Sequence, residues 1–140
     1  MPRSDAEPLP SAQASLLVRE VDLASNLSIP HSGVYPPVLA TTRMIALMEV
    51  AAAKCLEPLL EPGELTVGVT VEVLHTAATP PGVDVTATAR YVGRDGKVFQ
   101  FEVEAVDPGG EIGRGRHARA IIDAQRLLQG AAKRGRSKLG

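Results

Sequence analysis

Tryptophan is absent from this sequence of 140 residues, and aromatic residues make up only 3% of it. Because 44% of the residues are nevertheless hydrophobic, the core has to be assembled mainly from Val, Ala, Leu and Ile. The single cysteine, Cys55, excludes a disulfide framework and favours a reducing compartment. Three histidines and one cysteine without familiar ligand spacing predict no metal site, and no glycine-rich phosphate loop is present.

Long apolar runs are missing as well. No run approaches the roughly 18 residues that a membrane-spanning helix requires. Residues 1–15 are polar and contain prolines, without the apolar segment of a signal peptide. We therefore expect a cytoplasmic protein with no membrane partner.

Charge is unevenly distributed along the chain. Residues 126–140 carry five basic side chains and no acid, so the net charge of −1 divides into −6 for residues 1–125 and +5 for the remainder. We expect residues 126–140 to form a flexible basic tail without a nucleic-acid partner, because it has no aromatic side chains for base stacking. Residues 1–14 are predicted to be disordered, which leaves residues 15–125 as a single domain.

Residues 39–60, LATTRMIALMEVAAAKCLEPLL, predict a long helix around which the chain is organised. The stretch is long enough for about six helical turns. Apolar residues occupy most of its circumference, which is typical of a helix buried on several sides. Thr41 or Thr42 is a candidate N-cap, and Pro62 and Gly63 end the helical region.

Five strands are predicted around this helix, at residues 15–22, 65–76, 83–92, 97–107 and 111–123. In residues 65–76 the alternation places Leu65 and His75 on one face, and Thr66 and Gly68 on the other. Short turns favour antiparallel pairing, and the helix is the only element available to cover the apolar face. The sequence predicts an α+β fold, in which an antiparallel sheet wraps around one central helix.

Three polar residues are candidates for catalysis. Glu49 lies on the apolar side of the helix, where an uncompensated carboxylate costs several kcal/mol, and His75 lies at the end of an inward strand face. A carboxylate and an imidazole that face one cleft can act as a general base or orient water. Thr41 adds a hydroxyl at the positive end of the helix. Each has a structural alternative: Glu49 can reach solvent, and His75 can be a hydrogen-bonded core residue.

Three segments make the sequence recognisable. ATTRMIALMEVAAAKCLEPLLEPGE, VTVEVLHTAATPPG and EIGRGRHARAII resemble the fluoroacetyl-CoA thioesterase family of hot-dog-fold proteins, without gaps from about Tyr35 to Ile122. The resemblance implies a hot-dog fold, a homodimer in which two sheets join edge to edge, and hydrolysis of an acyl-CoA. Coenzyme A then enters only as part of the substrate, and no other cofactor is expected.

The resemblance also implies roles for individual residues. Thr41, Glu49 and His75 fall on the family's catalytic residues, and Gly68 and Arg119 fall on its substrate-contacting residues. A glycine in the middle of a strand often marks the close approach of a ligand or backbone. An arginine can bind a phosphate or a carbonyl, or can pair with a surface acid.

The loop before the helix departs from the family pattern. The family's fluoroacetyl enzyme has phenylalanines in this loop as an aromatic lid, whereas here Tyr35 is the only aromatic residue. We therefore expect Tyr35 to contact the substrate. The resemblance does not identify which acyl group the substrate carries.

Two other functions are compatible with the same fold. A non-catalytic acyl-CoA binding or sensing protein would bind CoA esters without turnover. An enoyl-thioester hydratase would also use a histidine and an acid, but its usual pattern of an Asp and a His close together in one segment is absent.

Overall fold

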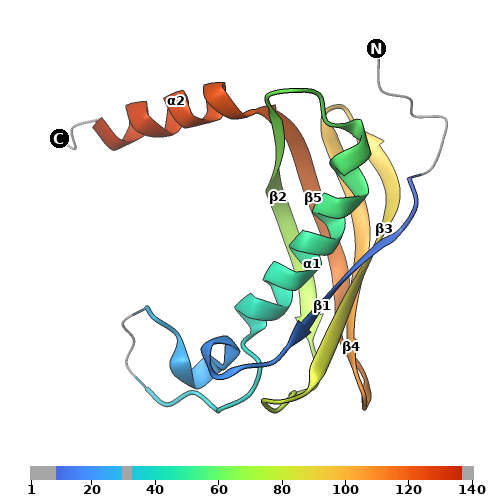
Figure 1. Cartoon of the computed structure of the whole chain (residues 1–140), viewed down its shortest axis with the longest axis vertical. Helices are drawn as coiled ribbons and strands as arrows, with labels where there is room; N and C mark the ends of the chain where they lie inside the picture. Colours follow the sequence, from blue (N-terminus) through green and yellow to red (C-terminus); the bar gives the residue numbers. More distant parts are fainter. Residues whose placement is uncertain (1–8, 30–32, 137–140) are drawn as a thin grey trace.

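A five-stranded antiparallel sheet curls around one long helix in the computed structural model, which describes residues 9–29 and 33–136 (Figure 1). The strands are β1 (Ala12–Leu17), β2 (Glu64–His75), β3 (Asp84–Asp95), β4 (Val98–Asp107) and β5 (Gly110–Asp123). Their order across the sheet is β1-β3-β4-β5-β2, and the central helix is α1 (Thr41–Leu56). The predicted α+β architecture is therefore confirmed.

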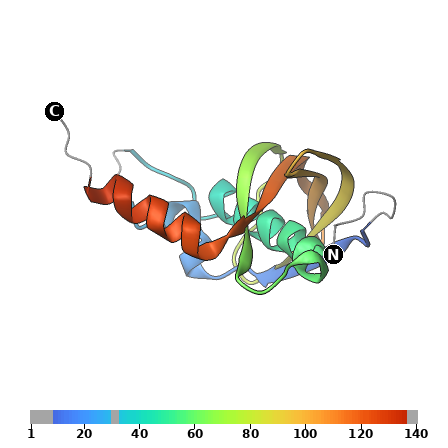
Figure 2. The same ribbon diagram turned by 90° about the horizontal axis from the view of Figure 1, so that it is seen from above.

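Short helical segments complete the chain. The 3₁₀ turns η1 (Glu20–Asp22) and η2 (Ala24–Asn26) precede α1, and η3 (Glu57–Leu59) extends its end. A second helix, α2 (Ala124–Arg136), follows β5 and projects beyond β2 (Figure 2). No described helix is long and apolar enough to cross a membrane.

The core lies between α1 and the concave face of the sheet. The helix buries Met44, Met48, Ala51, Ala52, Cys55 and Leu56, each with at most 2% of its surface exposed. Ala87 and Ala89 of β3 are fully buried opposite them, and small side chains there let the helix approach the sheet closely. The other flank of α1 is open, since Val50 remains 48% exposed. A helix that is apolar on most sides is thus covered on only part of its circumference.

The start of α1 differs from the prediction. Ala40 is the N-cap residue and makes no side-chain cap, so neither Thr41 nor Thr42 is the N-cap. The Ala40 amide instead donates to the carbonyl oxygen of Asp22 at 2.9 Å. Thr41 is therefore the first residue of the helix, and its hydroxyl is available for another partner.

Asp22 attaches the segment before the helix to the helix itself. Its carboxylate is completely buried, accepts a hydrogen bond from the Arg19 amide at 2.9 Å, and forms an ion pair with Arg43 at 2.7 Å. Burial alone raises the pKa of this carboxyl, but the contacts with Arg19 and Arg43 outweigh burial and hold the pKa below its ordinary value.

The first strand is displaced relative to the prediction. It covers Ala12–Leu17 rather than residues 15–22, because Glu20–Asp22 forms a 3₁₀ turn held by the Asp22 carboxylate. Pairing with β3 sets the earlier start, with Ala12 opposite Ala89. Only residues 9–14 of the predicted disordered segment are described, and Ala12 already belongs to the sheet.

Strand β2 contains a bulge that the alternation pattern does not reveal. Gly68 pairs with Arg119 and Thr70 with Ala118, so Val69 is an extra residue in the ladder. A bulge shifts the side-chain alternation by one residue. Thr66 and Gly68 therefore face α1 together with His75, and their predicted placement on the opposite face is wrong.

The C-terminal segment, for which a flexible tail is predicted over residues 126–140, contains the helix α2 over residues 124–136. The Asp123 carboxylate caps α2 by accepting a hydrogen bond from the Arg126 amide at 2.9 Å. Ala, Leu, Gln, Lys and Arg are favourable helix residues, and together with the cap they outweigh repulsion among the basic side chains. The last four residues, 137–140, lie outside the described part of the chain.

We expect Asp22→Asn to lower the free energy of unfolding at pH 7 by about 1–3 kcal/mol, because hydrogen bonds to a charged group are lost. The folded pKa of Asp22 is lowered, so its contribution is complete above the unfolded pKa and disappears as the pH falls through the folded pKa. Denaturant unfolding between pH 7 and pH 3 should give a shallower acid dependence for Asp22→Asn. Glu20→Gln, at an exposed acid of the same turn, is the control, and equal curves for wild type and Asp22→Asn would contradict this role.

Candidate active site

Thr41 and His75 meet where α1 begins and β2 ends. The Thr41 hydroxyl and His75 Nδ1 share a hydrogen bond of 2.7 Å. The other ring nitrogen, His75 Nε2, is buried and has no hydrogen-bond partner among the described residues. Buried polar atoms nearly always have a partner, so an unpaired ring nitrogen of this kind indicates a functional position.

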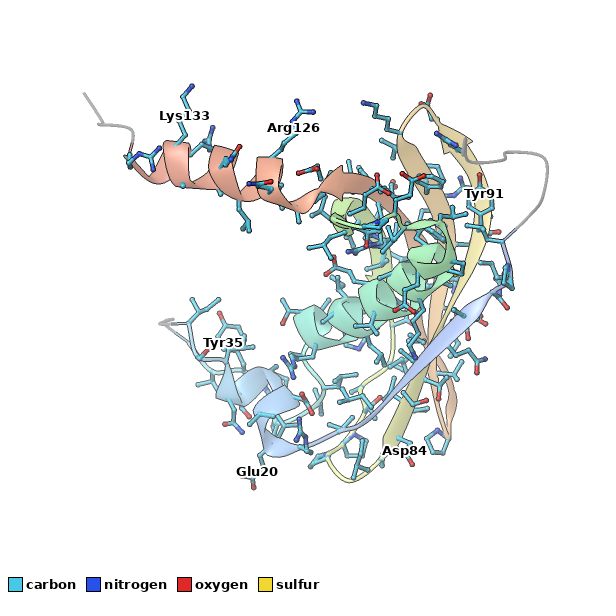
Figure 3. All side chains as sticks on the ribbon, turned by 45° about the horizontal axis from the view of Figure 1, so that its top comes forward. Glu20, Tyr35, Asp84, Tyr91, Arg126 and Lys133 are labelled. Atoms are coloured by element: carbon cyan, nitrogen blue, oxygen red, sulfur yellow. The ribbon has the colours of Figure 1, made fainter. Side chains whose placement is uncertain are left out.

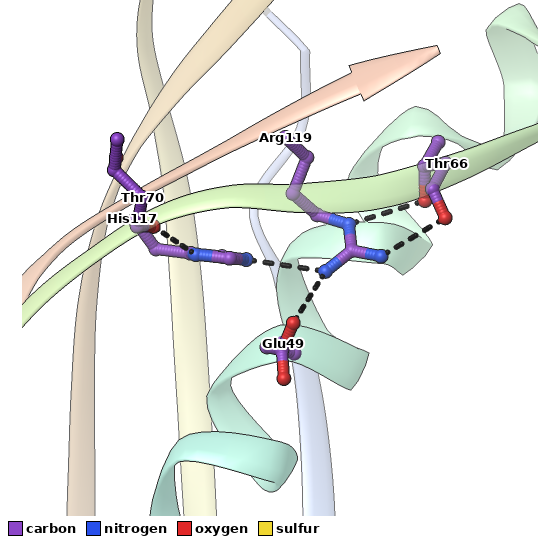
Figure 4. Close-up of polar contacts among 5 residues, drawn as sticks. All are labelled: Glu49, Thr66, Thr70, His117 and Arg119. Atoms are coloured by element: carbon purple, nitrogen blue, oxygen red, sulfur yellow. Dashed lines mark hydrogen bonds and ion pairs between the residues drawn. The ribbon is translucent and has the colours of Figure 1, made fainter. Parts of the chain in front are cut away.

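Glu49 pairs with Arg119 in a second cluster, two helical turns further along α1 (Figure 4). Arg119 Nη1 donates to Glu49 Oε2 at 3.1 Å. The Glu49 side chain is 39% exposed, so it lies at the margin of the buried helix face rather than within it as predicted. The Arg119 side chain is only 9% exposed, and a buried guanidinium requires partners of this kind.

Thr66 of β2 holds the rest of the guanidinium. Arg119 Nε donates to the Thr66 hydroxyl, and Nη2 donates to the Thr66 carbonyl oxygen, both at 3.1 Å. The planar, forked geometry of arginine suits such simultaneous contacts, which lysine cannot reproduce.

His117 supports the same guanidinium from β5. Its Nε2 accepts a hydrogen bond from Arg119 Nη1 at 3.2 Å, and its Nδ1 donates to the Thr70 carbonyl oxygen at 2.8 Å. These two contacts require a neutral imidazole with its proton on Nδ1. Burial lowers the pKa of His117, and the nearby Arg119 lowers it further, against opposing effects from Thr70 and Glu49.

Gly68 lies where the Glu49 carboxylate approaches β2 most closely. A Cβ atom at this position would lie 2.6 Å from Glu49 Oε2 and 3.6 Å from Arg119 Nη1. The separation of 2.6 Å from Glu49 Oε2 is shorter than van der Waals contact, so only glycine leaves the carboxylate in its observed place. The group that approaches Gly68 is the Glu49 side chain rather than backbone, and the predicted contact of Gly68 with substrate stays a prediction.

The predicted site residues form two clusters within one chain. Eight residues separate Thr41 from Glu49, which corresponds to about 12 Å along the helix axis. Thr41 and His75 make one cluster, and Glu49, Gly68 and Arg119 make the other. Tyr35 belongs to neither, because it lies on the loop ahead of α1, where its side chain is 41% exposed (Figure 3).

Thr66, Thr70 and His117 are the site residues that the sequence did not assign. The alternation in β2 placed Thr66 on the outer face, and only the bulge at Val69 brings it inward. His117 lies two residues before Arg119 and so on the same face of the strand, which the sequence alternation can detect. Its hydrogen-bond partner is a backbone carbonyl, which no sequence motif identifies.

A surface hollow lies on the other side of the sheet. It is lined mainly by charged side chains of β2–β5, among them Glu72, Arg90, Glu102 and Arg116. These four residues are directly opposite one another in the ladder, on the face away from α1. The hollow is therefore separate from both clusters. The described residues contain no group of three or more metal-ligating side chains placed to hold a metal ion.

Comparison with known proteins identifies the family. A model of the fluoroacetyl-CoA-specific thioesterase family matches residues 18–125. The chain belongs to this family. The curated fluoroacetyl-CoA thioesterase of Streptantibioticus cattleyicolor is 43% identical to it over 98 residues, which cover 70% of each protein.

Solved structures agree with this family. A crystal structure of the fluoroacetyl-CoA thioesterase, a threonine-to-alanine variant in complex with fluoroacetate, superposes with a TM-score of 0.85 at 34% identity, covering 91% of this chain and 98% of the other. A thioesterase superfamily member from Thermus thermophilus gives a TM-score of 0.83 at 29% identity, with 97% and 99% covered. A hot-dog-like protein from Thermanaerovibrio acidaminovorans shares the fold at 23% identity, with a TM-score of 0.79 and 94% of both chains covered. The expected hot-dog fold is confirmed.

We expect Gly68→Ala to displace the Glu49 carboxylate and break its ion pair with Arg119, while the strand pairing is preserved. Thioester hydrolysis should fall by at least about tenfold, since one methyl group removes a hydrogen bond between charged groups. Gly130→Ala in the exposed helix α2, where a Cβ meets open space, is the matched control and should change nothing. Full activity of Gly68→Ala would show that this close approach is unnecessary.

Proposed function

We propose that this protein hydrolyses a small acyl-CoA thioester to the free acid and CoA. Membership in a family of thioesterases supports the reaction class. The observation that carries the proposal is the His75 ring, which is oriented by Thr41 through Nδ1 while its buried Nε2 has no hydrogen-bond partner in the described part of the chain. An imidazole in this state is suited to transfer a proton to or from a reacting group.

The mechanism needs a group that begins the attack and a group that handles protons. In our proposal the Glu49 carboxylate attacks the thioester carbonyl, directly or through a water molecule that it activates. Arg119 holds the carboxylate oxygen Oε2. The carbon–sulfur bond breaks, water supplies the new oxygen of the acid, and the sulfur of CoA receives the proton.

The first turn of α1 is suited to stabilise the developing negative charge. The amides of Thr41 and Thr42 precede the first intrahelical hydrogen bonds, which start at Arg43 and Met44. Free amides at a helix N-terminus attract an anion. We propose that they, or the Thr41 hydroxyl, bind the oxyanion of the thioester carbonyl.

A complete site requires two copies of the chain in this proposal. Thr41, which contacts His75, lies about 12 Å along the helix axis from Glu49, too far for one small acyl group to contact both clusters. Among the described strands β2 has one neighbour only, β5, so its other edge is open. Antiparallel pairing of two β2 strands about a two-fold axis between Gly68 and His75 would place the His75 cluster of one protomer beside the Glu49 cluster of its partner.

Exposed apolar side chains support this homodimer. Val69 and Val71 along β2 are 50% and 43% exposed, and Val50 on the open flank of α1 is 48% exposed. An exposed edge strand with apolar side chains is a template for pairing with another chain. The proposed pairing covers the edge and brings the two α1 helices side by side.

The acyl group is proposed to be small, as in fluoroacetyl-CoA, the substrate named for the curated relative. A crystal structure of a threonine-to-serine variant of that enzyme contains acetyl-CoA. Tyr35, on the loop ahead of α1, is our candidate for contacting the substrate, and with less aromatic surface it is expected to select less strongly for a fluorinated group.

Release of free thiol from acetyl-, fluoroacetyl-, medium-chain and aromatic acyl-CoA tests the function. We expect turnover of the small esters by wild type, and a loss of at least about 100-fold in kcat for His75→Ala and for Glu49→Ala, because acid–base catalysis is removed. Gln13→Ala, at an exposed side chain on β1, is the control. Binding of CoA esters without thiol release would favour a sensing protein instead.

Mixing two inactive variants tests the shared site. If His75 of one protomer works with Glu49 of its partner, a heterodimer of His75→Ala and Glu49→Ala contains one intact site. An equimolar, re-equilibrated mixture should then recover about a quarter of wild-type activity, since half of the dimers are mixed and each has one of two sites. Absence of recovery, with mixed dimers demonstrated by mass spectrometry, would place each site within one protomer.

A further inference from the structure

We propose that His117 is a positioning residue that acts through Arg119 to fix the direction of the Glu49 carboxylate. The inference rests on the proposed function, in which Glu49 begins the attack on the thioester. No candidate role for His117 follows from the mechanism above, although it is one of the most deeply buried polar side chains in the protein, with 1% of its surface exposed.

The contacts of Arg119 Nη1 carry the argument. This nitrogen has two hydrogens: one is donated to His117 Nε2 at 3.2 Å and the other to Glu49 Oε2 at 3.1 Å. The remaining edge of the guanidinium is held by Thr66. Because the group is planar, a bond from one Nη1 hydrogen to His117 fixes the direction in which the second hydrogen points toward Glu49.

His117 is itself immobilised by the bulge in β2. Its Nδ1 donates to the carbonyl oxygen of Thr70, the residue directly after the extra residue Val69. Phe101 lies opposite His117 in the ladder between β4 and β5 and is also buried. The ring therefore has a hydrogen bond on both nitrogens and packing around it, and it cannot turn without losing one of these contacts.

Only the neutral ring fits this role. A protonated imidazole would present an N–H to the Arg119 guanidinium and place two cations in contact. The lowered pKa of His117, caused chiefly by burial, is consistent with a ring that remains neutral. His117 thus serves as an acceptor for arginine rather than as an acid or base in the reaction.

A matched pair of substitutions separates this role from simple core packing. The amide oxygen of a glutamine reaches close to the position of Nε2, so His117→Gln should still accept a hydrogen bond from Arg119. The shorter His117→Asn can still donate to the Thr70 carbonyl but presents no acceptor to Arg119. We expect His117→Asn to lower kcat about tenfold, the effect of one hydrogen bond to a charged group, with KM changed less than about twofold, and His117→Gln to retain most of the activity.

The same substitution in a second background tests whether His117 acts through Arg119. In the Arg119→Lys background the forked guanidinium is already absent, so adding His117→Asn should lower kcat by less than about twofold further. Equal losses in both backgrounds, or equal losses for His117→Asn and His117→Gln, would overturn the proposal in favour of a packing role. Thermal unfolding of each variant verifies that the compared proteins are folded.

Nitrogen-15 NMR gives a readout that does not depend on turnover. The His117 ring should be neutral with its proton on Nδ1 at pH 7, and the Arg119 Nη1 protons should exchange with solvent faster in His117→Asn than in wild type. A ring protonated on Nε2, or unchanged exchange, would refute the positioning contact. A wild-type protein that hydrolyses none of the thioesters but shows the expected tautomer and exchange would refute the proposed function instead.

Discussion

The bulge at Val69 is the feature on which the geometry of both clusters depends. Gly68 and His75 are an odd number of positions apart, so in a regular strand they would face opposite sides of the sheet. The extra residue reverses the alternation, so Thr66 and Gly68 face α1 in the first half of β2 and His75 faces it in the second. The same irregularity is adjacent to the Thr70 carbonyl that anchors His117. One additional residue therefore positions side chains from both halves of the strand.

The helix α1 supplies the other half of this arrangement. Its packed side consists of small and flexible side chains, which let it lie close to β3, while its flank carries Glu49 toward β2 and β5. Its first residue carries the hydroxyl that orients His75, and that position is set by the link between Ala40 and the buried Asp22. Side chains of very different chemistry are thus aligned by a single rigid element, which limits their relative motion.

The sequence was sufficient to predict α1, the strands β2 to β5, their antiparallel pairing and the inward position of His75, because these follow from periodicity and turn residues. It was insufficient at three kinds of position. The bulge at Val69 is invisible to alternation, because its residue types fit either face. The cap of α1 depends on a backbone contact with Asp22, which is distant in sequence. The helicity of residues 124–136 arises from a cap by Asp123 that charge counting alone overlooks.

The extra residue in β2 also has a consequence for how this strand can change. Most side chains near Val69 are at least partly exposed, and substitutions at exposed positions are generally tolerated. Removing a single residue there is a different kind of change, because it would turn Thr66 and Gly68 outward and leave Arg119 and Glu49 facing new neighbours. This strand therefore tolerates substitution of its residues far better than a change in its length. The number of residues between Thr66 and His75 is itself a structural constraint.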